Sequence, residues 1–99
     1  MILVTGSFRI PVAVRTEAVQ AMERVIAETL REPGCIAYSY AEDVREPGLF
    51  RVSEQWESRE ALAVHFASPH MVRWQAERAD LGMSERIVTA FVVSGEENL

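Results

Sequence analysis

The first residues of the chain alternate between apolar and polar side chains. The apolar parity consists of Ile2, Val4, Phe8 and Ile10. A period of two predicts a half-buried β-strand over residues 2–10, which Pro11 ends. Gly6 leaves a gap on the apolar parity, and this indicates either a β-bulge or a place where another group approaches the backbone.

The next segment changes to the spacing of an amphipathic helix. Its apolar face is expected to comprise Ala18, Val19, Met22, Val25, Ile26, Thr29 and Leu30. Three- and four-residue spacing of this kind predicts a helix of about four turns. We expect Thr16 to cap its N-terminus, with Glu17 in the first turn and Pro33-Gly34 as the end.

Two further strands follow, joined by a turn. Residues 35–42 alternate again, with Ile36, Tyr38 and Tyr40 on one parity. Residues 49–57 form the next predicted strand, and the turn from Asp43 to Gly48 contains Pro47-Gly48. The pair therefore predicts a β-hairpin with a loop of about five or six residues.

Helical signals return after the hairpin. Ser58 is an N-cap candidate for a short helix over 59–66, and Ser68-Pro69 is typical of the start of a second helix over 69–80. Gly82 is expected to end that helix. A last strand is predicted over 85–94.

The predicted order of elements is β-α-β-β-α(α)-β, which matches the α+β ferredoxin-like arrangement with helices on one face of an antiparallel sheet. We expect one domain over 1–99, with a polar tail at 95–99. The last strand is apolar on both parities, so both of its faces should be buried. One helical layer cannot cover both, and a homodimer packed through the open face of the sheet is predicted.

Charge and composition narrow the classes of function. The 99-residue chain has a net charge of −5, and all ten of its cations are arginine. An acidic chain without a basic run is a poor candidate for binding nucleic acid or anionic membranes. The single cysteine, Cys35, excludes an internal disulfide and a cysteine-based metal site within one chain. No signal peptide or transmembrane segment is evident, so a cytoplasmic protein is expected.

Glu54 is the first candidate for chemistry. It shares the parity of Phe50, Val52 and Trp56 in the predicted strand 49–57, so its carboxylate should face the helices. Burial raises a carboxyl pKa unless hydrogen-bond donors are supplied, and such a group can exchange protons near neutral pH. The structural alternative is a glutamate paired with an arginine or reaching the strand edge.

His65 is the second candidate. It lies on the inward stripe of its helix with Leu62 and Phe66, where it could serve as a general base, a proton shuttle or a substrate donor. The alternative is a core histidine satisfied by a backbone carbonyl. His70 follows in the next helix, and a metal held by two histidines and a glutamate is not required by their spacing, so no metal site is predicted.

Aromatic residues are expected to complete a pocket. Glu54 and His65 would share it with an apolar wall formed by Trp56 and Phe66, which is the usual composition of a ligand site. Tyr38 and Tyr40 are placed either at this pocket or at the dimer face. Trp74 is interpreted as a packing anchor or a lid.

Three segments together resemble the antibiotic biosynthesis monooxygenase family, especially its small quinol-monooxygenase-like members. These segments are REPGCIAY at 31–38, SEQWESREAL at 53–62 and HFASPHM at 65–71. The shared pattern is E-x-W-x-S, a histidine nine residues after the tryptophan, and then S/T-P-H. The resemblance covers residues 2–94.

The resemblance implies a homodimeric α+β barrel with a pocket between sheet and helices in each subunit. Family enzymes include oxygenases that act on quinols and anthrones with O₂ and without metal or flavin. Carried over by position, His65 is the expected base or donor, Glu54 orients it or couples to it, and Trp56 shapes the wall. His70 also matches the motif and is counted among the substrate-binding candidates.

Other members of the family leave alternatives. Haem-degrading relatives use an axial histidine where this chain has Gln75 and an asparagine where it has Thr5-Gly6-Ser7, which argues against haem breakdown. An isomerase or lyase acting on a small carbonyl compound is the second hypothesis, although the chain has no lysine for a phosphorylated substrate. A non-catalytic dimeric binding or stress-response domain is the third.

Overall fold

A computed structural model describes all residues from 1 to 99, and its strands form one antiparallel sheet in the order β2-β3-β1-β4. The strands are β1 (Ile2–Arg9), β2 (Cys35–Glu42), β3 (Leu49–Trp56) and β4 (Ser84–Val92). The helices are a short 3₁₀ turn, η1 (Val12–Val14), followed by α1 (Arg15–Thr29), α2 (Arg59–Ala67) and α3 (Pro69–Asp80). None of these helices has the length and apolar character needed to cross a lipid bilayer. The predicted α+β ferredoxin-like fold is confirmed.

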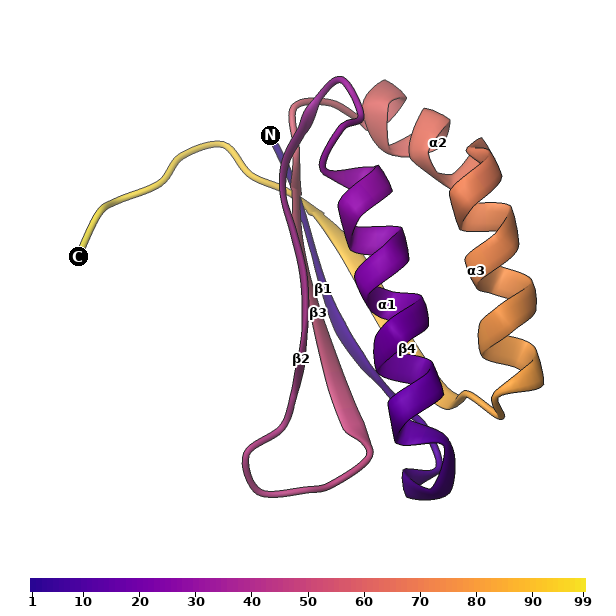
Figure 1. The fold of residues 1–99 in the computed structure, drawn as a ribbon. Helices are drawn as coiled ribbons and strands as arrows, with labels where there is room; N and C mark the ends of the chain where they lie inside the picture. The colour runs from indigo at the N-terminus through magenta and orange to yellow at the C-terminus, as the bar shows by residue number, and fades with distance from the viewer.

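All three α-helices lie on the same side of the sheet, as Figure 1 shows edge-on. The inward parities of β1 and β3 supply Val4, Phe8, Phe50 and Val52 to the core. Two buried clusters result. The larger lies under α1 and α3 around Phe8 and Trp74, and the smaller lies under α2 around Trp56. The site described below lies where these two clusters meet.

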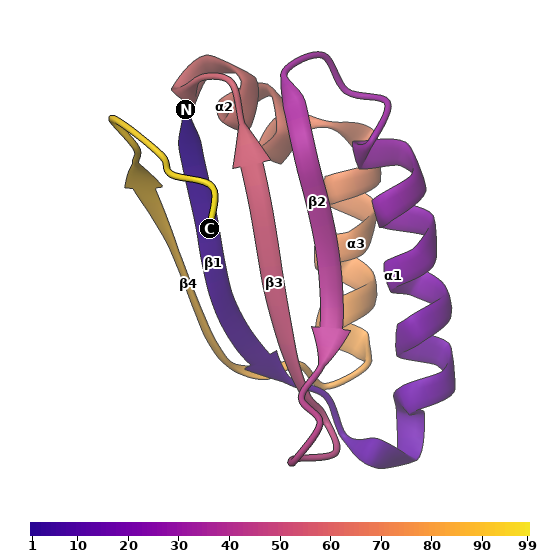
Figure 2. The same cartoon turned by 90° about the vertical axis from the view of Figure 1, so that its left-hand side faces the viewer.

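Strand β4 is the least covered strand. Figure 2 shows the bare face of the sheet, with β4 at one edge and the helices behind the other strands. Ile87 and Phe91 on the bare face are 71% and 49% exposed, and Val92 on the helix side is 84% exposed. Within one chain, neither face of β4 is buried, although its sequence is apolar on both parities.

Two local expectations are wrong. Thr16 does not cap α1, because η1 leads directly into a helix that starts at Arg15 and no side chain caps it. Ile36 does not share a face with Tyr38, because the pairing of β2 with β3 shifts between Cys35 and Ala37. The irregularity leaves Ile36 half exposed, whereas Tyr38 is buried.

Gly6 is explained by close approach of the backbone. A Cβ atom at this position would lie 2.1 Å from the carbonyl oxygen of Ile87 on the neighbouring strand β4. A side chain therefore cannot be accommodated while β1 and β4 keep this pairing. Of the two alternatives predicted for Gly6, the approach of another backbone is the one observed, and an irregularity in the same pairing follows between Ser7 and Arg9.

The helices α2 and α3 begin where their start signals predict, although only Ser58, and not Ser68, caps its helix through the side chain. The Ser58 side chain accepts a hydrogen bond from the Ala61 backbone nitrogen at 3.1 Å, as an N-cap residue does. Pro69 is the first residue of α3, where its missing N–H is not needed. The Ser68 hydroxyl instead donates to the carbonyl of His65, which fixes the sharp junction between α2 and α3.

Candidate functional site

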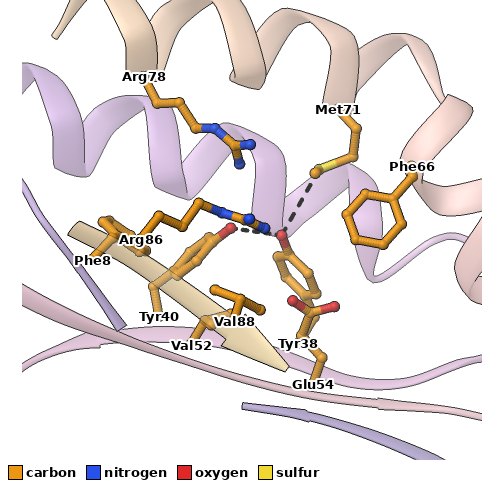
Figure 3. Close-up of a pocket in the computed structure, with 10 residues that line it drawn as sticks. All are labelled: Phe8, Tyr38, Tyr40, Val52, Glu54, Phe66, Met71, Arg78, Arg86 and Val88. Carbon is orange, nitrogen blue, oxygen red and sulfur yellow. Dashed lines mark hydrogen bonds between the residues drawn. The ribbon is translucent and has the colours of Figure 1, made fainter. Parts of the chain in front are cut away.

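A pocket lies between the sheet and the pair of helices α2 and α3, next to β4 (Figure 3). Five of its ten lining side chains are apolar, and these are Phe8, Val52, Phe66, Met71 and Val88. Its polar groups are the side chains of Tyr38, Tyr40, Glu54, Arg78 and Arg86. An apolar wall with a few converging polar groups is typical of a small-molecule site.

Glu54 is a buried carboxylate in this pocket, with 5% of its surface exposed. Its side chain accepts one hydrogen bond, from the indole nitrogen of Trp56 at 2.9 Å, and forms no ion pair. Burial raises the pKa of Glu54, while the Trp56 hydrogen bond and the charge of Arg86 oppose this rise. The carboxyl group therefore binds a proton more tightly than an exposed glutamate does, as expected of a group that exchanges protons with a ligand.

The two tyrosines meet inside the pocket. The hydroxyl oxygens of Tyr38 and Tyr40 lie 2.8 Å apart, so one donates to the other, and Tyr38 also lies 3.9 Å from the Met71 sulfur. Burial raises the pKa of both hydroxyls, which keeps them protonated and able to donate. Of the two places predicted for these tyrosines, the pocket is the one observed.

The free space in the pocket is small. Its volume is about 10 Å³, which is about the room for one water molecule. A larger ligand must displace part of the wall. Among the apolar wall residues, Phe66 on α2 is the most easily displaced, because its side chain is 39% exposed.

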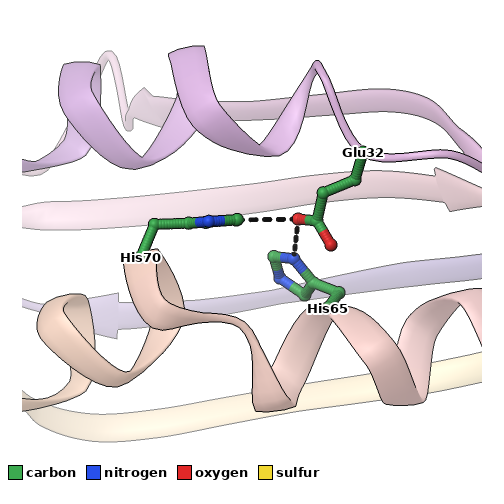
Figure 4. A group of neighbouring side chains, drawn as sticks. All are labelled: Glu32, His65 and His70. Atoms are coloured by element: carbon green, nitrogen blue, oxygen red, sulfur yellow. Dashed lines mark hydrogen bonds and ion pairs between the residues drawn. The ribbon is translucent and has the colours of Figure 1, made fainter.

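His65 belongs to a second polar cluster, together with Glu32 and His70 (Figure 4), and its ring packs against that of the pocket residue Tyr38. One carboxylate oxygen of Glu32, Oε2, lies 2.6 Å from Nδ1 of His65 and 2.8 Å from Nε2 of His70. His65 is 1% exposed, and its ring packs against Trp56 with centroids 4.6 Å apart. Burial lowers the pKa of His65, although Glu32 opposes this shift, so the neutral ring donates from Nδ1 to Glu32.

The loop after α1 brings Glu32 to this cluster. Gly34 has a φ of +84°, and a Cβ atom there would lie 2.6 Å from the Ala61 side chain on α2. Glycine is therefore required for the loop to pack this closely against α2. The carbonyl of Gly34 accepts a hydrogen bond from the backbone of Glu57, which anchors the loop to the end of β3.

Glu32, His65 and His70 offer the donor types of a zinc or iron site, with donor atoms within 4.8 Å of one another. A metal bound to Nδ1 of His65 would move the ring proton to Nε2. That atom is buried and has no hydrogen-bond partner, whereas metal-binding histidines normally donate this proton to an acceptor. The arrangement therefore fits a hydrogen-bonded cluster better than a metal centre.

The predicted site residues thus divide between two places. Glu54, Tyr38, Tyr40 and Phe66 line the pocket. Trp56, His65 and His70 lie behind it, and Trp74 is a packing anchor of the larger core cluster. No hydrogen bond or ion pair joins Glu54 to His65, and each has another partner, so the coupling of these two residues stays a prediction.

Three polar residues of the two sites were missed from the sequence. Glu32 lies in a loop 33 residues before His65, and nothing local in the sequence connects them. Arg78 follows Met71 and Trp74 at helical spacing, so it lies on the inward stripe of α3. Arg86 shares the helix-facing parity of Val88 on β4. Arg78 and Arg86 could have been found from the sequence, because each is a charged residue on an otherwise apolar face of its helix or strand.

Comparison with known proteins decides the family. A family model described as antibiotic biosynthesis monooxygenase matches residues 1–77. The chain belongs to this family. The resemblance noted in the sequence is thereby confirmed.

Several solved structures share the fold of this chain. A candidate antibiotic biosynthesis monooxygenase of Deinococcus radiodurans has a TM-score of 0.94 at 23% identity, over 100% of this chain and 98% of that chain. A Mycobacterium tuberculosis protein has a TM-score of 0.87 at 26% identity, over 98% of both chains. A Bacteroides thetaiotaomicron protein of unknown function, suggested to be an oxidoreductase, has a TM-score of 0.82 at 28% identity, over 91% of this chain and 94% of that chain.

A relative by sequence is an uncharacterised protein of Synechocystis. It is 32% identical over 80 residues, which are 81% of this chain and 54% of that protein. The chain therefore spans about half the length of this relative.

Proposed function

We propose that this protein is a monooxygenase that oxidises a small electron-rich aromatic compound, such as a quinol or an anthrone, with O₂ and without a cofactor. The observation that carries the proposal is Glu54, a buried carboxylate without an ion pair in an apolar pocket. Family membership supports the reaction class. The cytoplasmic location expected from the sequence stays a prediction.

Glu54 is the proposed general base. Deprotonation turns a phenol, or the enol form of an anthrone, into an electron-rich anion that can pass one electron to O₂. The Tyr38 and Tyr40 hydroxyls can donate hydrogen bonds to the oxygen of this anion, because burial keeps them protonated. The apolar wall excludes water, which keeps the resulting radical pair together.

The electrons balance without an external reductant. Recombination of the radical pair forms a carbon–oxygen bond, and a proton completes a hydroperoxide on the ring carbon. Loss of the remaining hydrogen from that carbon, with cleavage of the O–O bond, gives a carbonyl group and water. The net change for an anthrone is a CH₂ group plus O₂ to a C=O group plus H₂O.

The catalytic role predicted for His65 stays a prediction. Its ring packs against Tyr38 with centroids 5.3 Å apart, and Glu32 holds its Nδ1 atom. In this proposal His65 is a positioning residue for Tyr38, and Trp56 has the same role towards Glu54 through its 2.9 Å hydrogen bond.

The test is oxygen uptake by chelator-treated protein with a panel of naphthoquinols and anthrones, compared with autoxidation. We expect uptake above autoxidation, and Glu54→Gln is expected to lower kcat/KM by about 100-fold or more, the usual contribution of a general base. Glu60→Gln on the exposed side of α2 is the matched control and should retain the wild-type rate. A Glu54→Gln variant with the wild-type rate would overturn the role of Glu54.

No uptake with any compound of the panel would contradict the oxygenase proposal and favour the two alternatives drawn from the sequence. An isomerase or lyase would convert small carbonyl compounds without consuming O₂. A non-catalytic domain would bind a ligand and convert nothing.

We also propose that the functional unit is a homodimer in which a second copy covers the bare face of the sheet and β4. The exposed apolar residues Ile87, Phe91 and Val92 support this, because an isolated chain leaves them in water. Light scattering at micromolar concentration should give twice the mass of one chain, and Phe91→Glu should shift the protein towards monomer. A wild-type monomer would contradict the dimer.

A further inference from the structure

Two arginines from different elements line the same pocket. Arg78 extends from α3 and Arg86 from β4, and Figure 3 shows both guanidinium groups on the side of the pocket that holds the tyrosine hydroxyls. Arg78 is partly buried, whereas Arg86 is exposed at the pocket rim. Two like charges have therefore been brought together at one wall of an otherwise apolar cavity.

Neither arginine has an acidic partner. Five of the other arginines form ion pairs with carboxylates, and these are Arg9, Arg15, Arg24, Arg51 and Arg73. Arg78 and Arg86 form no ion pair and no side-chain hydrogen bond. Burial lowers the pKa of Arg78, and the charge of Arg86 lowers it further. Placing a second cation beside a half-buried one is unfavourable unless an anion joins them.

The charges of the pocket leave one positive charge unmatched. The two guanidinium groups contribute +2, and Glu54 contributes −1 when it is ionised, so at least one positive charge has no counter-charge and an anionic ligand would supply one. Guanidinium groups match the planar geometry of a carboxylate and form strong charge-assisted hydrogen bonds with it. The apolar wall is suited to an aromatic ring that carries such a group.

We propose that Arg78 and Arg86 bind the carboxylate of an aromatic acid, with the ring of that acid extending along the apolar wall towards Glu54. This inference rests on the proposed function, because that function identifies the ring as the part of the ligand that is oxidised. The substrate class is then an aromatic or polyketide-like acid rather than a neutral quinol. Phe66 and the Arg86 side chain are the exposed parts of the wall that must move to admit the ring.

The test compares three rigid probes by calorimetry: naphthoate, the neutral naphthamide of the same shape, and naphthyl phosphate. None of them needs O₂, so binding is measured without turnover. We expect naphthoate to bind about 100-fold more tightly than naphthamide, which corresponds to about tenfold for each of the two charge-assisted contacts. Added salt should reduce this preference.

Arg86→Gln and Arg78→Gln should each lower the preference for naphthoate by about tenfold. Arg59→Gln, an exposed position on α2 with the same loss of charge, is the matched control and should retain the preference. Arg78→Lys keeps a charge at the half-buried position and guards against a folding defect in Arg78→Gln, since it should retain part of the preference.

Equal affinity for naphthoate and naphthamide would overturn the inference, as would a preference that survives the double variant Arg78→Gln/Arg86→Gln. Absence of naphthoate binding to the wild type, or binding of naphthyl phosphate alone, would also overturn the assignment of a carboxylate. A naphthoate preference in a protein that consumes no O₂ would instead refute the oxygenase function and leave the anion site standing.

Discussion

Two carboxylates of this protein, the buried Glu54 and the partly buried Glu32, have opposite surroundings. Glu32 lies in a closed cluster where one of its oxygens faces two imidazole nitrogens at 2.6 and 2.8 Å. Glu54 lies in a pocket where it receives a single hydrogen bond, from Trp56, and no ion pair. The Glu32 carboxylate is compensated by its neighbours, whereas that of Glu54 is largely uncompensated.

This difference separates a carboxylate that stabilises the fold from one that is suited to proton transfer. A buried carboxylate with two donors is stable as an anion and holds the elements that carry the donors together. A buried carboxylate with one donor is unfavourable as an anion and is ready to take up a proton. The number of hydrogen bonds around a carboxylate is therefore a poor guide to the reactive centre, because Glu32 has more of them than Glu54.

The largest effect on stability is expected for Glu32→Ala. This change leaves the N–H group of buried His65 without an acceptor and leaves that of partly buried His70 with only the Ser68 hydroxyl oxygen at 3.2 Å, at a cost of about 2–3 kcal/mol in the free energy of unfolding. For a domain of this size the melting temperature should fall by roughly 10–20 °C. Thermal denaturation followed by circular dichroism measures this.

The matched control is Glu28→Ala, which removes an exposed carboxylate from the same end of α1. It should leave the melting temperature nearly unchanged. If Glu32→Ala proved as stable as this control, the cluster would contribute nothing to folding and the comparison would fail.

A smaller effect of opposite sign is expected for Glu54→Gln, which keeps an acceptor for Trp56 and removes the buried charge. Because the folded state raises the pKa of Glu54, the wild type loses stability relative to the variant as pH rises from its ordinary pKa of 4.5 through the folded value. The variant should therefore melt a few degrees higher than the wild type at pH 8, with a smaller difference near pH 4. A constant difference across this range, with Glu60→Gln as reference, would argue against a raised pKa.

Most of the fold was accessible from the sequence because its signals are local. Alternation located the strands, and Ser58 and Pro69 marked the starts of α2 and α3. Errors arose where tertiary contacts overrode local preference. The 3₁₀ turn η1 displaced the expected cap at Thr16, and the irregular pairing of β2 exposed Ile36.

The site was less accessible than the fold. The alternation of β3 correctly predicted that Glu54 faces the helices, and helical spacing correctly predicted that His65 is buried. Contacts between distant segments decide which polar groups meet. Here the loop that contains Gly34 places Glu32 beside His65. Tyr38 lines the pocket with Glu54 and packs against His65, and spacing along the sequence could not reveal this contact.

The central claim, that Glu54 is a buried carboxylate poised to accept a proton, is tested most directly by an NMR titration of the glutamate side-chain carboxyl carbons. The Glu54 signal is assigned as the one missing in Glu54→Gln. The account predicts a midpoint above the ordinary glutamate pKa of 4.5. A Glu54 midpoint at or below 4.5 would show a compensated carboxylate and contradict its assignment as the base.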